Sequence, residues 1–337
     1  MSDRTFRALR ITETAPGVFE RAIVERRTSE LPAGELLLRV AYSALNYKDA
    51  LSASGNKGIT RTYPHTPGID AAGIVEESSH PDWKPGDPAI VTSYDLGMNT
   101  DGGLGGYIRV PAAWVLRLPE GMSLAESMVL GTAGITAAIA LYKLEQMGQS
   151  PQLGPVVVTG ASGGVGSVAV ALLAHCGYHV IAATGKADAE AYLRSLGAAE
   201  VVGRDYVQDT SARPLLRARW AGGIDTAGGQ TLATLLKACA QNGSIAACGL
   251  VDAPQLPATV YPFILNGVNL LGVDSATFPM ELREMLWQRL AGEWRIPVLD
   301  RIRISAPLDE VPRWLDALLR GEVRGRVLVH LDAEGGA

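Results

Sequence analysis

A glycine-rich segment at residues 155–166 constrains the fold of this chain more than any other feature. It reads PVVVTGASGGVG, with glycines at Gly160, Gly163 and Gly166, and an Ala-, Val- and Leu-rich helix is expected at Gly166–Cys176. Glycines at a strand-to-helix turn let the backbone approach a pyrophosphate, and the first N–H groups of the helix bind phosphate. The segment predicts a dinucleotide site, and an unliganded βα turn is the alternative. The glycines expected to approach the cofactor here are Gly160, Gly163 and Gly164.

The segment stands in a series of alternating strands and helices. Strands are expected at 155–159, 178–183, 200–202, 223–226, 244–248 and 269–273, with helices at 166–176, 187–196 and 231–240. Strands that alternate with helices indicate a parallel, doubly wound sheet of the Rossmann type.

The first 125 or so residues follow a different pattern. Short β-branched runs at 35–42, 71–76, 89–93 and 106–110 are separated by Gly and Pro turns, which predicts a mainly antiparallel β domain. A helix is expected at Thr132–Met147, and a last strand at Gly325–Leu331 is expected to pair back onto the first domain. Because 337 residues exceed one typical core, we expect an α/β chain of two domains, 129–275 and 1–128 with 276–337.

Composition excludes several classes of protein. The net charge is −5 and no Lys/Arg cluster is evident, which argues against a nucleic-acid partner. The start of the chain lacks the apolar run of a signal peptide, and no unbroken apolar stretch is long enough to span a membrane. The three scattered cysteines are expected to be reduced thiols of a cytoplasmic protein, and their spacing excludes a structural zinc lobe.

The end of the second expected Rossmann strand indicates which dinucleotide binds. A free ribose 2′-OH usually meets a carboxylate about 20 residues after the glycine turn. Here the chain reads Thr184-Gly185-Lys186, and the first carboxylate is Asp188. A hydroxyl, an open backbone and a lysine suit a 2′-phosphate, with Arg204 as a second cation, so NADPH is favoured over NADH. Ordinary solvated surface is the alternative for both cations.

Over essentially its whole length the chain resembles the medium-chain dehydrogenase/reductase superfamily. The resemblance rests on the β-rich first domain, residues 67–73 (PGIDAAG), residues 131–134 (GTAG) and the glycine turn. It implies that the first domain is a GroES-like catalytic domain. Zinc members have a ligand Cys and a ligand His where this chain has Asn46 and Ile69, neither of which is a good metal ligand, so we expect no metal.

Without a metal to polarise an alcohol oxygen, a reductase suits a C=C bond conjugated to a carbonyl. Six sequence words resemble the bacterial acryloyl-CoA reductase group, also called quinone oxidoreductases: 43–51 (SALNYKDAL), 159–166, 246–250, 262–265, 272–275 and 325–329. This resemblance implies NADPH-linked reduction of acryloyl-CoA to propanoyl-CoA. It also implies cofactor contacts at Tyr47, at Ser162–Val165, at Thr184–Lys186 and at Arg204.

Several side chains are candidates for the chemistry. Tyr47 is expected either to donate a hydrogen bond or proton near the reacting carbons or to wall the cofactor. Asn46 and Asp49 complete the catalytic candidates, with a structural ion pair between Lys48 and Asp49 as the favoured alternative, and Asp70 is expected to be a buried anchor. Further cofactor candidates are Gly249, Leu250, Ser275 and Arg326, and candidates for the CoA phosphates are Arg61, Arg324 and Arg326.

Three functions stay open at this point. The first is an enoyl-thioester reductase, the second a quinone or general enone reductase, and the third a non-catalytic nucleotide-binding protein. By analogy with the superfamily, a homodimer is expected.

Overall fold

The computed structural model describes residues 3–331 and divides into two compact units. Unit 1 comprises Met1–Thr132, Ala276–Ala291 and Arg303–Ala337, and unit 2 comprises Ala133–Ser275 and Gly292–Ile302. The stretch 292–302 therefore groups with the second unit, although the sequence analysis placed it in the first. Its apolar side chains Trp294 and Ile296 are buried, which a helix-and-strand pattern alone does not reveal.

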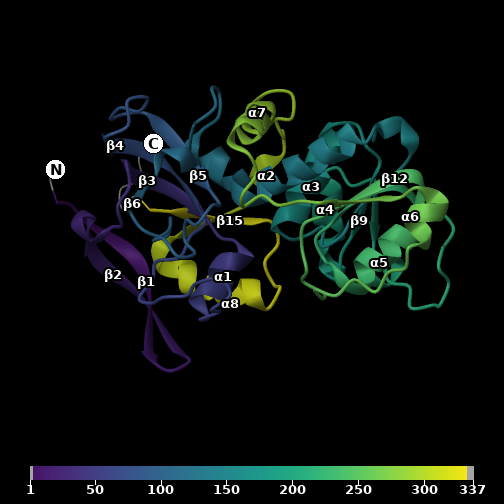
Figure 1. Cartoon of the computed structure of the whole chain (residues 1–337), viewed down its shortest axis with the longest axis horizontal. Coiled ribbons are helices and arrows are strands. Elements are labelled where there is room, and N and C mark those ends of the chain that lie inside the picture. Colours follow the sequence, from purple (N-terminus) through teal and green to yellow (C-terminus); the bar gives the residue numbers. More distant parts are fainter. Residues whose placement is uncertain (1–2, 332–337) are drawn as a thin grey trace. The chain divides into compact units, whose positions relative to one another are not determined.

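Unit 2 is built on a six-stranded parallel sheet with helices on both faces (Figure 1). Its spatial order is β10-β9-β8-β11-β12-β13, so the order reverses between β8 and β11. The strands are β8 (Val156–Val158), β9 (Val180–Ala183), β10 (Glu200–Val202), β11 (Trp220–Asp225), β12 (Cys239–Ala247) and β13 (Asn269–Gly272). This order defines the doubly wound Rossmann fold and confirms the fold class predicted from the sequence.

The helices of unit 2 are α3 (Gly164–His175), α4 (Glu190–Ser195), α5 (Gly229–Lys237) and α6 (Tyr261–Asn266). The helix expected to reach residue 240 ends earlier, because β12 begins at Cys239. α6 has no counterpart in the sequence analysis. Its Tyr261-Pro262 start and its end at left-handed Gly267 are local signals that could have revealed it.

Unit 1 contains a hairpin and a seven-stranded sheet. The hairpin pairs β1 (Thr5–Ala15) with β2 (Val18–Arg27), and the sequence analysis did not predict it. The sheet has the order β14-β15-β3-β4-β5-β7, with β6 also paired to β3. Its strands are β3 (Leu36–Ala44), β4 (Asp70–Ser78), β5 (Pro88–Thr92), β6 (Tyr107–Val110), β7 (Val115–Arg117), β14 (Arg303–Pro307) and β15 (Arg326–His330).

The expected return of the last strand is confirmed. β15 pairs antiparallel with β3, where Leu328 lies opposite Ala44, and it pairs parallel with β14. Residues 44–46, which lead into helix α1 (Tyr47–Ala53), therefore lie beside the start of β15. Helix α1 packs on α8 (Val311–Leu319), and Ala50, Val311 and Leu315 share one buried cluster (Figure 1). Helix α7 (Met280–Ala291) also belongs to this unit.

A long helix, α2 (Leu124–Gln146), runs from one unit into the other. Gly131, with φ 50° and ψ −150°, interrupts it, so the predicted helix at Thr132–Met147 corresponds to its second part. By length and composition α2 could cross a membrane, but 78% of its apolar window is buried in the protein. α2 is therefore a core helix of the protein.

Candidate functional site

At two positions, Gly160 and Gly166, the turn between β8 and α3 leaves no room for a side chain. Gly160 has φ +56°, and a Cβ there would lie 2.2 Å from Thr226 Oγ1, while a Cβ on Gly166 would lie 2.2 Å from the Gly160 oxygen. Gly163 closes the turn by donating its N–H to that oxygen at 2.9 Å and then serves as the N-cap of α3. The first N–H groups of the helix, at Gly164 and Val165, belong to half-buried residues and have no helical partner. This cradle fits the pyrophosphate of a dinucleotide.

The turn lies at the point where the strand order reverses, which is where ligands of doubly wound sheets bind. A buried polar group missed by the sequence analysis ties β8 to β11 there. Thr159 Oγ1 donates to Asp225 Oδ1 at 2.7 Å and accepts from the Thr226 N–H at 3.0 Å. Burial raises the pKa of Asp225, which also accepts the Gly228 N–H at 2.7 Å. Gly249 approaches so closely that a Cβ there would lie 2.1 Å from the Thr226 oxygen.

The ends of β8, β9 and β10 bring together the residues predicted to read the 2′ position. Ser162 and Thr184 share a hydroxyl–hydroxyl hydrogen bond of 3.0 Å, and the Lys186 N–H donates to Thr184 Oγ1 at 3.2 Å. A Cβ on Gly185 would lie 2.8 Å from Arg204 Nη2, so the guanidinium lies against this glycine. Hydroxyls, an open backbone and a cation next to a carboxylate-free segment fit a 2′-phosphate.

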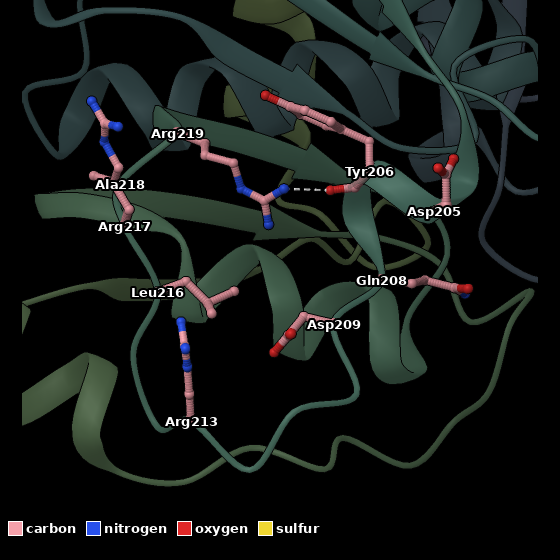
Figure 2. Close-up of a pocket in the computed structure, with 9 residues that line it drawn as sticks. All are labelled: Asp205, Tyr206, Gln208, Asp209, Arg213, Leu216, Arg217, Ala218 and Arg219. Carbon is pink, nitrogen blue, oxygen red and sulfur yellow. Dashed lines mark hydrogen bonds between the residues drawn. The ribbon is translucent and has the colours of Figure 1, made fainter.

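A hollow of about 610 Å³ lies on the loop that follows Arg204 (Figure 2). Figure 2 shows Arg219 directed at the Tyr206 carbonyl oxygen, to which it donates at 2.6 Å, while Arg213 and Arg217 lie on the same loop. Asp209 on its wall is paired with Lys237. None of the predicted contact residues lines this hollow, so we do not assign it to the dinucleotide.

In unit 1, a buried carboxylate holds together three segments around Tyr47. Asp70, at the start of β4, is fully buried. It accepts the Thr132 N–H at 2.9 Å and the Thr132 hydroxyl at 2.6 Å, Asn46 Nδ2 at 2.8 Å and Arg326 Nη2 at 3.1 Å. The structure agrees with the interpretation of Asp70 as a buried anchor. Ser93, a residue with φ +68° that the sequence analysis did not single out, extends the network through a 3.1 Å hydrogen bond to Thr132 Oγ1.

The structure corrects the prediction for Arg326. Its side chain is 3% exposed and its guanidinium donates to Val129 O, Leu45 O, Asn46 Oδ1 and Asp70 Oδ2. A guanidinium enclosed in this way inside unit 1 is not available to a cofactor ribose or to CoA phosphates. The other two phosphate candidates, Arg61 and Arg324, are exposed.

The structure also corrects the prediction for Asp49. This residue is fully buried and accepts three backbone N–H groups, from Asn46 at 2.7 Å, Gly68 at 3.1 Å and Ile69 at 2.9 Å. Burial and the neighbouring Asp70 raise its pKa to about 7, although the N–H donors oppose this shift. Asp49 thus anchors the loop before β4 by accepting backbone N–H groups. This structural role replaces both the catalytic role and the ion pair with Lys48 that were expected from the sequence.

Tyr47 is the exposed member of this region. It is the first residue of α1 and 45% exposed, whereas Asn46 before it is half-buried in the network. Of the remaining cofactor candidates, all in unit 2, Leu250 is 63% exposed and the Ser275 hydroxyl accepts a hydrogen bond from Thr136 at 2.9 Å.

The side chains at the two positions where zinc relatives have ligands do not fit a metal. Asn46 is engaged with Asp70 and Arg326, and Ile69 is apolar and 2% exposed. Within residues 3–331, no three His, Cys, Asp or Glu side chains lie close enough together to hold a metal ion. The side chains at these two positions therefore do not form a metal site.

The chain combines a Rossmann sheet, a glycine-lined turn that fits a pyrophosphate and an antiparallel β unit. This combination is typical of nucleotide-dependent oxidoreductases. Residues 32–120 match the alcohol dehydrogenase GroES-like domain family, and residues 164–292 match the zinc-binding dehydrogenase family. The chain belongs to the medium-chain dehydrogenase/reductase superfamily, as predicted from its sequence words.

Relatives at high identity span nearly the whole chain. A putative quinone oxidoreductase, YhfP of Bacillus subtilis, is 46% identical over 90% of this chain and 92% of its own length. The acrylyl-CoA reductase AcuI of Ruegeria pomeroyi is 44% identical over 94% of this chain and 96% of its own. The YhdH oxidoreductase of Salmonella enterica, solved with NADP, has a TM-score of 0.94 at 41% identity and covers 97% of this chain and 100% of its own. YhfP has itself been solved with NAD, with a TM-score of 0.94 at 44% identity and the same coverage of the two chains.

Proposed function

We propose that this protein reduces the C=C bond of a small enoyl thioester with NADPH, and that acrylyl-CoA, converted to propanoyl-CoA, is its preferred substrate. The observation that carries the cofactor assignment is the cluster of Ser162, Thr184, Gly185 and Arg204 at the carboxyl ends of neighbouring strands. The substrate assignment is supported by the 44% identity to an acrylyl-CoA reductase.

NADPH, when bound, supplies a hydride to the β carbon of the acceptor, and the α carbon gains a proton, so that C=C becomes CH–CH. The chain's own residues bind and orient the partners. The glycine turn and the N-terminus of α3 hold the pyrophosphate, while Arg204 and Lys186 neutralise the 2′-phosphate. Tyr47 is the residue proposed to meet the acceptor: its exposed phenol would donate a hydrogen bond or a proton there, or its ring would wall the cofactor. Arg61 and Arg324 are the remaining candidates for the CoA phosphates.

A panel of NADPH-oxidation assays with acrylyl-CoA, crotonyl-CoA and simple quinones tests the proposal. We expect the highest kcat/KM with acrylyl-CoA. The rival function, a quinone or general enone reductase, is favoured by the 46% identity to a putative quinone oxidoreductase, and comparable efficiency with quinones would establish it instead. NADPH binding without turnover of any acceptor would mark a non-catalytic nucleotide-binding protein.

We also propose that the enzyme is a homodimer formed at the β13 edge of unit 2. β13 has a partner strand, β12, on one side of the sheet and ends the strand order on the other. Large apolar side chains are exposed on this strand and on the helix that precedes it in the chain. On β13, Leu270 is 37% exposed, and on α6 the exposed fractions are 45% for Tyr261, 57% for Leu265 and 68% for Ile264. An open strand edge with adjacent apolar surface favours pairing with a second copy.

A cytoplasmic location is part of the same proposal. Its support is chemical: among the described residues, Cys176, Cys239 and Cys248 form no disulfide. Such thiols fit a reducing compartment. Fractionation of the native host's cells, followed by immunodetection, would test it.

A further inference from the structure

The side chain of Asn46 meets two hydrogen-bond acceptors and one donor. Its Nδ2 donates to Asp70 Oδ2 at 2.8 Å and to the Ala44 oxygen at 3.2 Å, while its Oδ1 accepts from Arg326 Nη1 at 2.9 Å. A carboxylate and a carbonyl oxygen require a donor, and a guanidinium requires an acceptor. The position therefore needs a primary amide: an aspartate lacks the donor, and a leucine lacks both.

The backbone around Asn46 is held as firmly as its side chain. The Asn46 N–H donates to Asp49 Oδ2 at 2.7 Å, and its carbonyl oxygen accepts the Asp49 N–H at 3.0 Å. The preceding residue, Leu45, donates its N–H to Val327 O at 3.0 Å and accepts from Arg326 at 2.9 Å. The backbone N–H and C=O groups of Leu45 and Asn46 thus all have buried partners on β15 or α1.

Tyr47 itself shows the opposite situation. It is one residue beyond Asn46, its side chain is 45% exposed, and among the described residues its hydroxyl has no hydrogen-bond partner. The phenol is therefore open to a ligand, while the location of its Cα is fixed by the buried bonds of Asn46.

We infer that Asn46, bridging Asp70 and Arg326, is the positioning residue for Tyr47. The amide of Asn46, the carboxylate of Asp70 and the guanidinium of Arg326 together hold the first residue of α1 in place. The inference rests on the proposed function, in which Tyr47 contacts the substrate. A misplacement of a contacting group by about 1 Å costs roughly 100-fold in rate, so a small relaxation at Asn46 is enough to matter.

The test compares Asn46→Asp with the charge swap Asn46→Asp/Asp70→Asn. The single variant places two carboxylates together and removes the amide donor. The swap restores one donor–acceptor pair between positions 46 and 70 with the roles reversed, and Arg326 Nη1 can still pair with the carboxylate at position 46. It does not restore the bond to the Ala44 oxygen, and it places an amide nitrogen opposite Arg326 Nη2, so only a partial recovery is expected. Asn99→Asp is the matched control, because Asn99 also donates its amide to an aspartate, Asp95, at 2.9 Å, on an exposed loop of the same unit.

Two readouts follow each variant. The first is kcat and KM with the acceptor that the wild type reduces best, together with the Kd for NADPH. We expect Asn46→Asp to lower kcat roughly 10- to 100-fold with NADPH binding unchanged, and the swap to recover part of this loss. The second is the ¹⁹F resonance of Tyr47 in protein labelled with 3-fluorotyrosine, assigned by its disappearance in Tyr47→Phe. We expect this resonance to shift or broaden in Asn46→Asp, to return toward the wild-type position in the swap and to stay unchanged in Asn99→Asp.

An unchanged Tyr47 resonance and kcat in folded Asn46→Asp would overturn the inference. A swap that is no better than the single variant would instead show that the bonds to the Ala44 oxygen and from Arg326 Nη2, which the swap leaves unmade, are needed as well. If Asn46→Asp does not fold, Thr132→Val gives a milder form of the same test, with the same direction expected. It removes one hydroxyl donor to Asp70, together with the partner of the Ser93 hydroxyl, and leaves the Asn46 side chain intact. If the wild type reduces no enoyl thioester, the proposed function fails, and the ¹⁹F readout still decides on the positioning role.

Discussion

Arg204 and Lys186 flank the end of β9, where no carboxylate lies until Asp188. We expect Arg204→Ala and Lys186→Ala each to raise the KM for NADPH about tenfold or more, because each removes a charge-assisted contact to the 2′-phosphate, and to leave the KM for NADH nearly unchanged. Steady-state kinetics with both cofactors measures this. Arg213→Ala is the matched control, since this arginine belongs to the neighbouring hollow and not to the Gly185 contact. Equal effects on the two cofactors would show that the cations do not read the 2′-phosphate.

Two roles remain for Tyr47, and they differ in what the hydroxyl contributes. If the phenol donates to the substrate, Tyr47→Phe loses about tenfold or more in kcat, and Tyr47→Ala is little worse. If the ring only walls the cofactor, Tyr47→Phe behaves as the wild type and Tyr47→Ala alone is impaired. We expect the first pattern, because this exposed hydroxyl has no hydrogen-bond partner among the described residues. Single-turnover rates of NADPH oxidation would distinguish the two patterns.

At the scale of the element, helix α2 depends on the conformation of a single glycine. Gly131 has φ 50° and ψ −150°, a combination essentially restricted to glycine, and a Cβ there would lie 2.4 Å from Asp70 Oδ2. We expect Gly131→Ala to lower the free energy of unfolding by about 1–3 kcal/mol from backbone strain, and further through the clash with Asp70.

Gly148 provides the control for that prediction. It also has a positive φ, +80°, at the end of the same helix, but a Cβ there would meet nothing within 4 Å. Gly148→Ala therefore reports strain without the clash, and denaturant unfolding of both variants separates the two effects. Equal losses of stability in the two variants would contradict the contribution of the Asp70 contact.

At the scale of the whole molecule, stability should depend on pH through Asp49. Its pKa is raised to about 7, above the ordinary value of 3.8, so between these values the folded protein binds more protons than the unfolded chain. This group's contribution to stability is therefore complete below about pH 4 and is lost as the pH rises through 7. We expect Asp49→Asn to flatten the fall in the free energy of unfolding between pH 5 and 8. The difference between wild-type and variant unfolding curves measures the effect, and parallel curves would contradict the raised pKa.

Assembly is the second property of the whole molecule. If two copies pair through the β13 edge, placing a charge in the exposed apolar surface beside it should separate them. We expect Ile264→Glu to convert a dimer to a monomer in size-exclusion chromatography with light scattering, because Ile264 is 68% exposed and a buried unpaired carboxylate is costly. The exposed Val18, on the hairpin of unit 1, supplies the control substitution Val18→Glu, which should leave the mass unchanged. A wild-type monomer would end the proposal.

Much of the nucleotide-binding unit could be predicted because its signals are local. The glycine turn, the strand–helix alternation and the carboxylate-free stretch after β9 each lie within a short span of sequence, and the backbone conformations they require are set by neighbouring residues. The hairpin β1–β2 and helix α6 were missed although both are built from neighbouring residues, and α6 has local signals at Pro262 and Gly267. The stretch 292–302 was assigned to the other domain because its grouping depends on which surfaces pack together.

The sequence by itself determined the superfamily, the phosphate cradle and the loss of metal ligands at Asn46 and Ile69. Only the tertiary structure decided what Arg326, Asp70 and Asp49 do. Arg326 meets Asp70 across 256 residues and Asn46 across 280, so no local pattern distinguishes it from a solvent-exposed phosphate ligand. The physical reason is that a charge has no fixed role until its surroundings are known: a guanidinium in water is open to a phosphate, whereas one enclosed with a carboxylate, an amide and two carbonyl oxygens is already fully bound.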